Sequence, residues 1–253
     1  MTWNPGALAP RPAAASVPAM LRAQTKAELT LTLRNGEQVL LSLVIPLGLL
    51  VVLTLVPFVS VPGRRVDFFV PGVLALAVMS SAFTGQAIAT GFERQYGVLK
   101  RLGATPLPRW VLLGAKTLGV LAVELLQLVL ISAVGLALGW HPHGDAGVRL
   151  LVALGTAAYS GHGLLLGGTL RGLTTLAAAN LLWFVLLLLG GVVFPLSELG
   201  PGVHVVQYLP SAALSDGLRQ LLQHGQLVVR DVVTLAVWAG AVLTAAARCF
   251  RWE

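Results

Sequence analysis

The sequence has few charged residues and a single cysteine. Charged residues make up 11% of the 253 residues, whereas apolar residues make up 56%. A soluble domain has about 25% charged and about 45–50% apolar residues. One soluble core of this length would leave too little polar surface to face water, which excludes a soluble globular enzyme, a disordered chain and a nucleic-acid-binding domain. The lone Cys249 excludes an intramolecular disulfide and a cysteine metal cluster. The composition therefore indicates an integral membrane protein.

A phosphate-binding loop and a set of catalytic residues are also missing from the sequence. ATP hydrolysis needs a glycine-rich loop that ends in Gly-Lys-Ser/Thr. The nearest match, Gly114–Thr117, has Ala115 in place of the required glycine. His141 and His143 lie close together, but a metal site would need further ligands beside them. We therefore expect this chain to have no catalytic residues, no bound cofactor and no metal, so that any ATP and Mg²⁺ belong to a partner.

Long apolar runs predict six membrane-spanning helices. A helix needs about 20 mostly apolar residues to cross a bilayer. The predicted spans cover residues 39–61, 68–90, 117–140, 150–170, 173–195 and 232–247. The last of them is the shortest, and its boundaries are the least defined. We expect an all-α integral membrane protein in which residues 1–38 form a cytoplasmic tail with an interfacial helix, and residues 39–253 form a six-helix transmembrane domain.

The positions of the basic residues predict the orientation in the membrane. Cytoplasmic loops of membrane proteins are enriched in Lys and Arg. If the N-terminus is inside, the cytoplasmic segments contain 12 of the 17 basic residues. Arg64 and Arg65 run against this pattern. We expect both termini in the cytoplasm and, because the Ala-, Gly- and Leu-rich composition is typical of a GC-rich bacterial source, a location in the bacterial inner membrane.

Two segments are amphipathic but are not predicted to span the bilayer. Val17–Asn35 mixes leucines with basic residues and is expected to lie in the inner interface, near anionic lipid headgroups. Ala212–Gln223 places its leucines on one helical face, with Ser211 as the expected cap and Gly225 as the expected end. Twelve residues are too few to cross a bilayer. The second segment is therefore expected to be re-entrant or interfacial on the outer side.

The densest charge cluster is Phe92–Leu102, which reads FERQYGVLKRL and lies between the second and third predicted spans. At about 100° per residue, Phe92, Tyr96 and Leu99 share one face of a helix. The opposite face carries Glu93, Gly97, Lys100 and Arg101, with Arg94 at its border. A short helix joined to two spans could pass a push from a soluble partner into the membrane. A positive-inside loop whose charges only fix the topology explains the same pattern equally well.

Three stretches together resemble one family. They are GFERQYGVLKRLGATPLPRWVLLGAK, the outer segment VVFPLSELGPGVHVVQYLPSAALSDGLRQLL, and the lead RAQTKAELTLTLRNGEQVLLSLVIP. In this order they are similar to the coupling loop, the outer segment and the elbow helix of the type-2 ATP-binding-cassette (ABC) transporter permeases. The resemblance implies six spans, a dimer with a second permease copy, and a separate ABC ATPase on the cytoplasmic side.

The resemblance also assigns residues to the family's elements. The coupling helix falls on Phe92–Leu102, and the outer re-entrant helices fall on Val203–Leu209 and Ala212–Gln223. The candidate ATPase contacts are then Phe92, Glu93, Arg94, Tyr96, Gly97, Leu99, Lys100 and Arg101. The outer segment contributes Pro195, Pro210 and Arg219.

A few polar residues lie within the predicted spans. Polar groups in a bilayer are usually functional or paired. Glu124 is expected either to line the cytoplasmic entrance of a transport path or pair with a neighbouring helix, or to be a buried acid that is hydrogen-bonded across helices or to Gln127. His162 and Asn180 are expected mainly to form hydrogen bonds between helices. Glycines at small-xxx-small spacing, such as Gly163 and Gly167, weakly favour close helix packing.

The leading hypothesis is a permease subunit that exports a hydrophobic or amphipathic substrate, such as a lipid, a drug-like natural product or a lipid-linked glycan. Membrane lipids are expected neighbours, and nucleic acid is not an expected partner. One alternative is a secondary transporter driven by an ion gradient, although such folds tend to carry internal repeats. Another is a membrane-embedded lipid-modifying enzyme, for which His162 alone offers too little.

Overall fold

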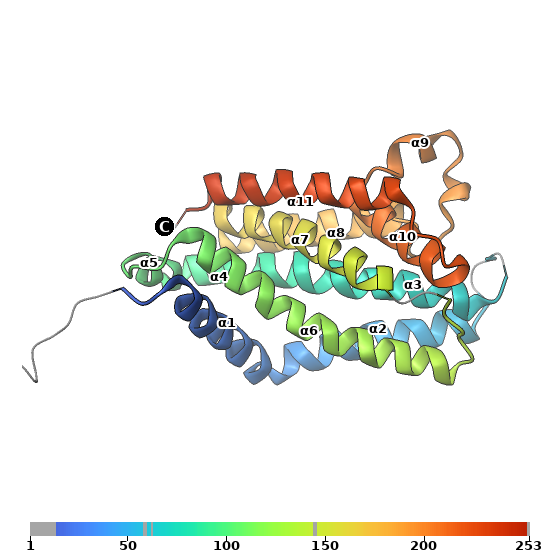
Figure 1. Ribbon diagram of the computed structural model, residues 1–253, viewed down its shortest axis with the longest axis horizontal. Coiled ribbons are helices and arrows are strands. Elements are labelled where there is room, and N and C mark those ends of the chain that lie inside the picture. The colour runs from blue at the N-terminus through green and yellow to red at the C-terminus, as the bar shows by residue number, and fades with distance from the viewer. Residues whose placement is uncertain (1–13, 58–59, 62, 144–145, 252–253) are drawn as a thin grey trace, which may run out of the picture.

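The computed structural model describes residues 14–57, 60–61, 63–143 and 146–251, and every regular element in this part of the chain is a helix (Figure 1). The elements are α1 (Val17–Arg34), α2 (Gly36–Leu55), α3 (Arg65–Val78), the π-helix η2 (Met79–Gly85), α4 (Gln86–Gln95), α5 (Val98–Gly103), α6 (Arg109–Ala137), α7 (Ala146–Thr169), α8 (Gly172–Leu189), the 3₁₀ helix η3 (Leu196–Gly202), α9 (Val203–Val206), α10 (Pro210–His224) and α11 (Val229–Cys249).

Five helices in the described residues are long and apolar enough to cross a membrane. They are Arg65–Gln95, Arg109–Ala137, Gly147–Thr169, Gly172–Leu189 and Val229–Cys249. The shortest predicted span, 232–247, is therefore part of a longer helix. The first predicted span, 39–61, corresponds to α2, in which the described apolar stretch Ser42–Leu55 is shorter than the five others. The all-α membrane architecture is confirmed, whereas the sixth span stays a prediction.

Two predicted spans extend six residues past the ends of their helices. Helix α2 ends at Leu55 rather than at residue 61, and Pro57 follows closely. A proline disfavours helical geometry in the residue before it, which hydropathy does not reveal. Helix α8 ends at Leu189 rather than at residue 195, because Gly190 caps it and Gly191 adopts a φ of 67°. Glycine adopts this left-handed geometry without a steric penalty, so the apolar run continues after the helix has stopped.

The centre of the bundle is one continuous helical rod formed by α3, η2 and α4. In the apolar 18-residue stretch that makes this rod a candidate span, 83% of the residues are buried, whereas in the corresponding stretch of α8 only 22% are buried. The rod packs against α7, α8, α10, α2 and α6. A helix that is apolar on all sides belongs inside a bundle, and every α3 residue from Phe68 to Val78 is buried. Glycines on α7 allow a close approach to the rod, since a Cβ at Gly163 would lie 2.7 Å from the carbonyl oxygen of Phe83.

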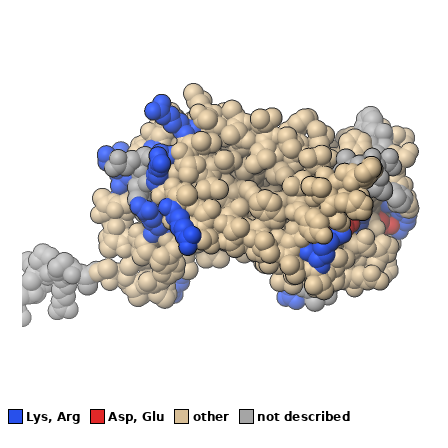
Figure 2. All heavy atoms as spheres, turned by 90° about the horizontal axis from the view of Figure 1, so that it is seen from above, with Lys and Arg blue, Asp and Glu red and all other residues tan. Residues whose placement is uncertain are grey.

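The bundle has two distinct ends (Figure 1). Helix α1, the turn between α4 and α5, and the C-terminal end of α11 lie together at one end, which we call the α5 end. The elements η3, α9 and α10 lie at the other, which we call the α10 end. Figure 2 shows Lys and Arg side chains at both ends of the visible face and a broad band without them between the ends. This distribution fits a bundle whose middle lies in hydrocarbon.

Candidate coupling site

The segment Phe92–Leu102 is not the single helix that the sequence predicted. Helix α4 ends at Gln95, Gly97 adopts a left-handed φ of 72°, and α5 begins at Val98. The Gly97 N–H donates a hydrogen bond of 3.1 Å to the Arg94 carbonyl. A residue with a Cβ would be strained at this φ, whereas glycine is not. Helical-wheel faces therefore do not extend across Gly97, although α5 does end at Gly103 as expected.

The break separates side chains that the sequence placed on one face. The rings of Phe92 and Tyr96 stack, with centroids 6.0 Å apart. Tyr96 is 67% exposed, whereas Leu99 is fully buried and packs in a small core with Leu112 and Leu164. Lys100 and Arg101 are exposed on α5. The outward-facing surface of this turn is therefore aromatic and basic, and the buried Leu99 packs α5 against the bundle.

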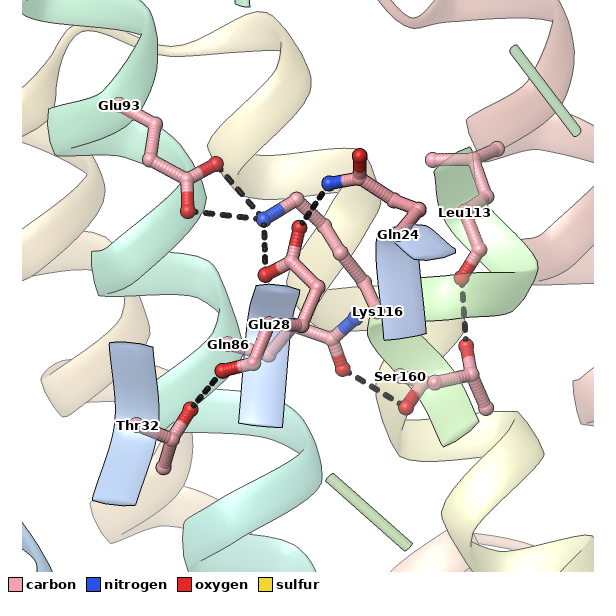
Figure 3. Close-up of polar contacts among 9 residues, drawn as sticks. Gln24, Glu28, Thr32, Gln86, Glu93, Leu113, Lys116 and Ser160 are labelled. Atoms are coloured by element: carbon pink, nitrogen blue, oxygen red, sulfur yellow. Dashed lines mark hydrogen bonds and ion pairs between the residues drawn. The ribbon is translucent and has the colours of Figure 1, made fainter. Parts of the chain in front are cut away.

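Glu93 turns inward, toward a buried lysine (Figure 3). The Nζ atom of Lys116 on α6 lies 2.7 Å from Oε2 of Glu93 on α4 and 3.0 Å from Oε2 of Glu28 on α1. The Lys116 side chain is only 4% exposed. Gln24 donates a 2.8 Å hydrogen bond to the other Glu28 oxygen. We call Lys116, Glu28 and Glu93 the Lys116 cluster.

The Lys116 cluster joins three separate elements at the α5 end. The side chain of Glu93 is 21% exposed and that of Glu28 is 14% exposed, so water screens their ion pairs only partly. Helix α1 packs closely against α6 at Gly119. A Cβ added to this glycine would lie 3.1 Å from the Glu28 Cβ. Glu93 is therefore placed to hold the α4–α5 turn to α1 and α6.

Sequence reasoning missed this cluster. In the sequence, Lys116 lies in the failed loop match Gly114–Thr117 and among the cytoplasmic basic residues, and Glu28 lies in the amphipathic segment Val17–Asn35. The available signal was a lysine near the start of an apolar helix, one helical turn from Gly119. A buried cation requires an opposite charge. The partner could not be identified, because residues 28, 93 and 116 are far apart along the chain.

Glu124 is buried between helices. Its Oε2 accepts a hydrogen bond from Thr156 on α7, and its Oε1 has no partner among the described residues. Gln127, the partner suggested by the sequence, instead accepts from Ser81 at 2.9 Å and donates to the Ser42 carbonyl at 2.8 Å. The geometry thus favours a hydrogen bond of Glu124 across helices, to Thr156, over a bond to Gln127 on its own helix.

The other two polar residues of the spans differ from the prediction. Nδ1 of His162 lies 2.8 Å from the Ala158 carbonyl oxygen of its own helix, so this hydrogen bond is not between helices. The ring instead contacts other elements, with its centroid 5.2 Å from that of Trp238 and 6.2 Å from that of Phe83. Asn180 is exposed on the outer face of α8. The Asn180 side chain therefore lies on the surface of this chain.

At the α10 end, α10 spans Pro210–His224 and ends at Gly225 with a φ of 67°, as expected. Its N-cap is Leu209 rather than the expected Ser211, because Pro210 occupies the first helical position, for which its fixed φ is suited. Within the expected helix Val203–Leu209, α9 covers Val203–Val206. Pro195 is buried and caps η3.

Arg219 anchors α10 to the central rod. Its Nη2 donates a 2.9 Å hydrogen bond to the Gly191 carbonyl, and its guanidinium lies 4.0 Å from the Phe68 ring centroid. Burial lowers the pKa of Arg219 to about 10, against the opposing effect of Asp216. Arginine stays charged at neutral pH, so this contact is a cation–π interaction. The role of Arg219 that the structure shows is to fix the outer segment.

Comparison with known proteins identifies the family of this sequence. The sequence matches the family described as "ABC-2 type transporter" over residues 20–222, which includes the Lys116 cluster, the α4–α5 turn and most of α10. It is also similar to a protein of Bacillus subtilis (strain 168) named "Putative transport permease YvfS". The two are 25% identical over 230 residues, which cover 87% of this chain and 92% of the relative. The chain therefore belongs to the ABC-2 type transporter family, whose members are permease subunits of ABC transporters.

Proposed function

We propose that this chain is the membrane subunit of an exporter that moves a hydrophobic or amphipathic substrate, using ATP hydrolysed with Mg²⁺ by a separate ABC ATPase. One observation carries the proposal. The α4–α5 turn presents an exposed aromatic and basic surface, Tyr96 with Lys100 and Arg101, while its inner side is tied into the bundle through the Lys116 cluster. A surface of this kind suits a soluble partner that pushes on the membrane domain.

The connections of the turn give the push a route. Helix α4 continues into η2 and α3, the buried rod at the centre of the bundle. Glu93 also binds Lys116 on α6, and Lys116 binds Glu28 on α1. A displacement of the turn must therefore break these ion pairs or carry α1 and α6 along with the rod. Both α1 and the end of α11 share the α5 end, so a partner in the cytoplasm implies cytoplasmic termini (Figure 1).

The outer face of α8 supports a second permease copy and a weakly polar pathway. Asn180 is exposed there beside Leu181 and Phe184, which are 68% and 53% exposed. An amide that faces hydrocarbon without a partner is unfavourable. A second copy against α8 would cover Asn180, and a pathway between the copies would have apolar walls, because α8 contains no charged residue. Such walls fit a lipid, a drug-like molecule or a lipid-linked glycan.

Co-purification with an ABC ATPase tests the proposal. We expect Lys100→Ala with Arg101→Ala to weaken ATPase binding strongly and to leave the permease folded, because both side chains are exposed. The matched control is Arg64→Ala with Arg149→Ala, which removes the same charge at the α10 end. Retained ATPase binding by the first variant, or full transport without any ATPase, would contradict the proposal.

Site-directed crosslinking gives a second measurement. Cys249 is the only cysteine, so Cys249→Ser provides a cysteine-free background. Tyr96→Cys in this background should crosslink to the ATPase, whereas Arg149→Cys should not. The reverse pattern would place the ATPase at the α10 end and refute the assignment of the turn.

A further inference from the structure

A hollow of about 810 Å³ lies at the α5 end and is lined by four arginines. Arg94 comes from α4, Arg109 from the start of α6, Arg248 from the end of α11, and Arg251 from the residues after it. The remaining described lining residues are Thr169, Cys249 and Phe250. No Asp or Glu is among the described residues that line this hollow. Guanidinium groups from separate parts of the chain thus converge on one space.

Packing and hydrogen bonds join two of the segments that line the hollow. Phe250 is 2% exposed and packs in the small core with Leu99. The Arg251 N–H donates a 3.1 Å hydrogen bond to the Gly168 carbonyl, and Nη1 of Arg94 donates a 3.2 Å bond to the Leu170 carbonyl. Both acceptors lie at the end of α7. The α4 side and the C-terminal side of the hollow are therefore both bonded to the end of α7.

The lining of the hollow suits an anion. Guanidinium groups bind phosphate oxygens through paired, charge-assisted hydrogen bonds. Each guanidinium has five N–H donors, so it can bind a phosphate in addition to the contacts that it makes within the chain. Four such groups can hold one or two phosphates.

We propose that this hollow binds the phosphate groups of an anionic phospholipid from the inner leaflet. The proposal rests on the proposed orientation, in which the α5 end faces the cytoplasm. The hollow lies where α7 and α11 end, at the expected depth of lipid headgroups, and Trp110 beside Arg109 is 59% exposed, as expected of a residue at the membrane interface. Basic pockets between helix ends on this side are suited to such headgroups. The bound lipid would join α4, α6, α7 and α11 next to the coupling turn.

Lipid retention by the purified permease tests the site. Arg248→Gln with Arg251→Gln should weaken binding of cardiolipin and phosphatidylglycerol roughly tenfold or more, as measured by native mass spectrometry. The matched control is Arg22→Gln with Arg34→Gln, two exposed arginines on α1. It removes the same charge from the same end and should change binding by less than about twofold. Equal losses in both variants would mean general attraction to anionic lipid and would overturn the site.

Arg109→Gln offers a second variant if the double substitution fails to fold, because Arg109 is exposed at the start of α6. It should weaken cardiolipin binding more than Arg22→Gln does. An equal effect of the two substitutions would count against the site.

Cys249 reports independently on the hollow that it lines. Nanodiscs that contain cardiolipin should slow its reaction with a maleimide compared with nanodiscs of phosphatidylcholine alone. Inorganic phosphate that protects Cys249 as well as cardiolipin does would indicate a site for a free anion and would overturn the lipid assignment. An Arg248→Gln/Arg251→Gln variant that keeps its lipid but loses the ATPase would indicate a protein-docking surface instead. Because lipid binding is measured on the permease alone, a failure of ATPase binding would not affect this test.

Discussion

Replacing Lys116 by methionine tests the Lys116 cluster most directly. Lys116→Met keeps most of the side-chain volume and removes the charge, which leaves the carboxylates of Glu28 and Glu93 facing each other. Both oxygens now lie within 3.0 Å of the same Nζ, so their separation is no more than about 6 Å. Two charges at this distance repel by about 3 kcal/mol at an effective dielectric constant of about 20. Breaking a buried ion pair typically costs about 3–5 kcal/mol. Because both carboxylates keep some exposure, we expect a loss near the lower value.

Thermal unfolding in detergent would measure this loss. For chains of about this length, 1 kcal/mol shifts the midpoint by roughly 2–4 °C, so Lys116→Met should lower it by roughly 6–12 °C. Lys100→Met is the matched control, because it removes the same charge from an exposed position on α5. A surface substitution of this kind usually changes stability by less than about 0.5 kcal/mol.

A triple variant separates charge from packing. Glu28→Gln and Glu93→Gln added to Lys116→Met remove all three charges and keep the shapes of the side chains. Replacing a complete buried ion cluster by neutral groups is often close to neutral in stability. We expect the triple variant to recover most of the lost stability. A Lys116→Met protein as stable as the wild type, or a triple variant no more stable than Lys116→Met, would refute the electrostatic reasoning.

Three further predictions concern single positions. Gly97→Ala should lower stability by about 1 kcal/mol, because the residue has positive φ and no atom lies within 4 Å of the added Cβ, so backbone strain is the only cost; an unchanged midpoint of thermal unfolding would argue against the broken turn. Gly163→Ala should destabilise the protein by about 1–3 kcal/mol because its Cβ would meet backbone atoms of η2, whereas the control Gly240→Ala, with open space around it, should be neutral or slightly stabilising. Equal midpoints of thermal unfolding for the two variants would contradict the packing of α7. Glu124→Gln should keep transport within about twofold and should not lower the amount of protein, since the bond with Thr156 can persist in the amide; loss of transport by a stable variant would assign Glu124 to the pathway.

Most of the fold could be predicted from local pattern. The apolar runs located the five candidate spans, and Gly103 and Gly225 correctly marked the ends of α5 and α10. The errors occur where a residue changes the backbone without changing the hydropathy. Gly97 fits a helical wheel as well as any residue, yet it breaks the helix between α4 and α5. Gly191 and Pro57 likewise shorten helices inside or beside apolar runs.

The coupling site could be predicted only in part. The exposed positions of Lys100 and Arg101 follow from a charged loop between two spans, whereas the exposure of Tyr96 does not, because the sequence placed it on one face with the buried Leu99. The inward turn of Glu93 does not, because its partner Lys116 lies 23 residues further along the chain. The arginines of the hollow come from α4, from the start of α6 and from the C-terminal end of α11, so no single segment of the sequence indicates that they converge.

The sequence by itself determined that this chain lies in a membrane, that it is helical, and that it has no phosphate-binding loop of its own. These properties depend on composition and local periodicity, which each segment carries alone. Only the tertiary structure decided which charges meet. Charges such as Lys116 and Glu28 interact through space over a few ångströms, and folding alone brings such distant residues within that range.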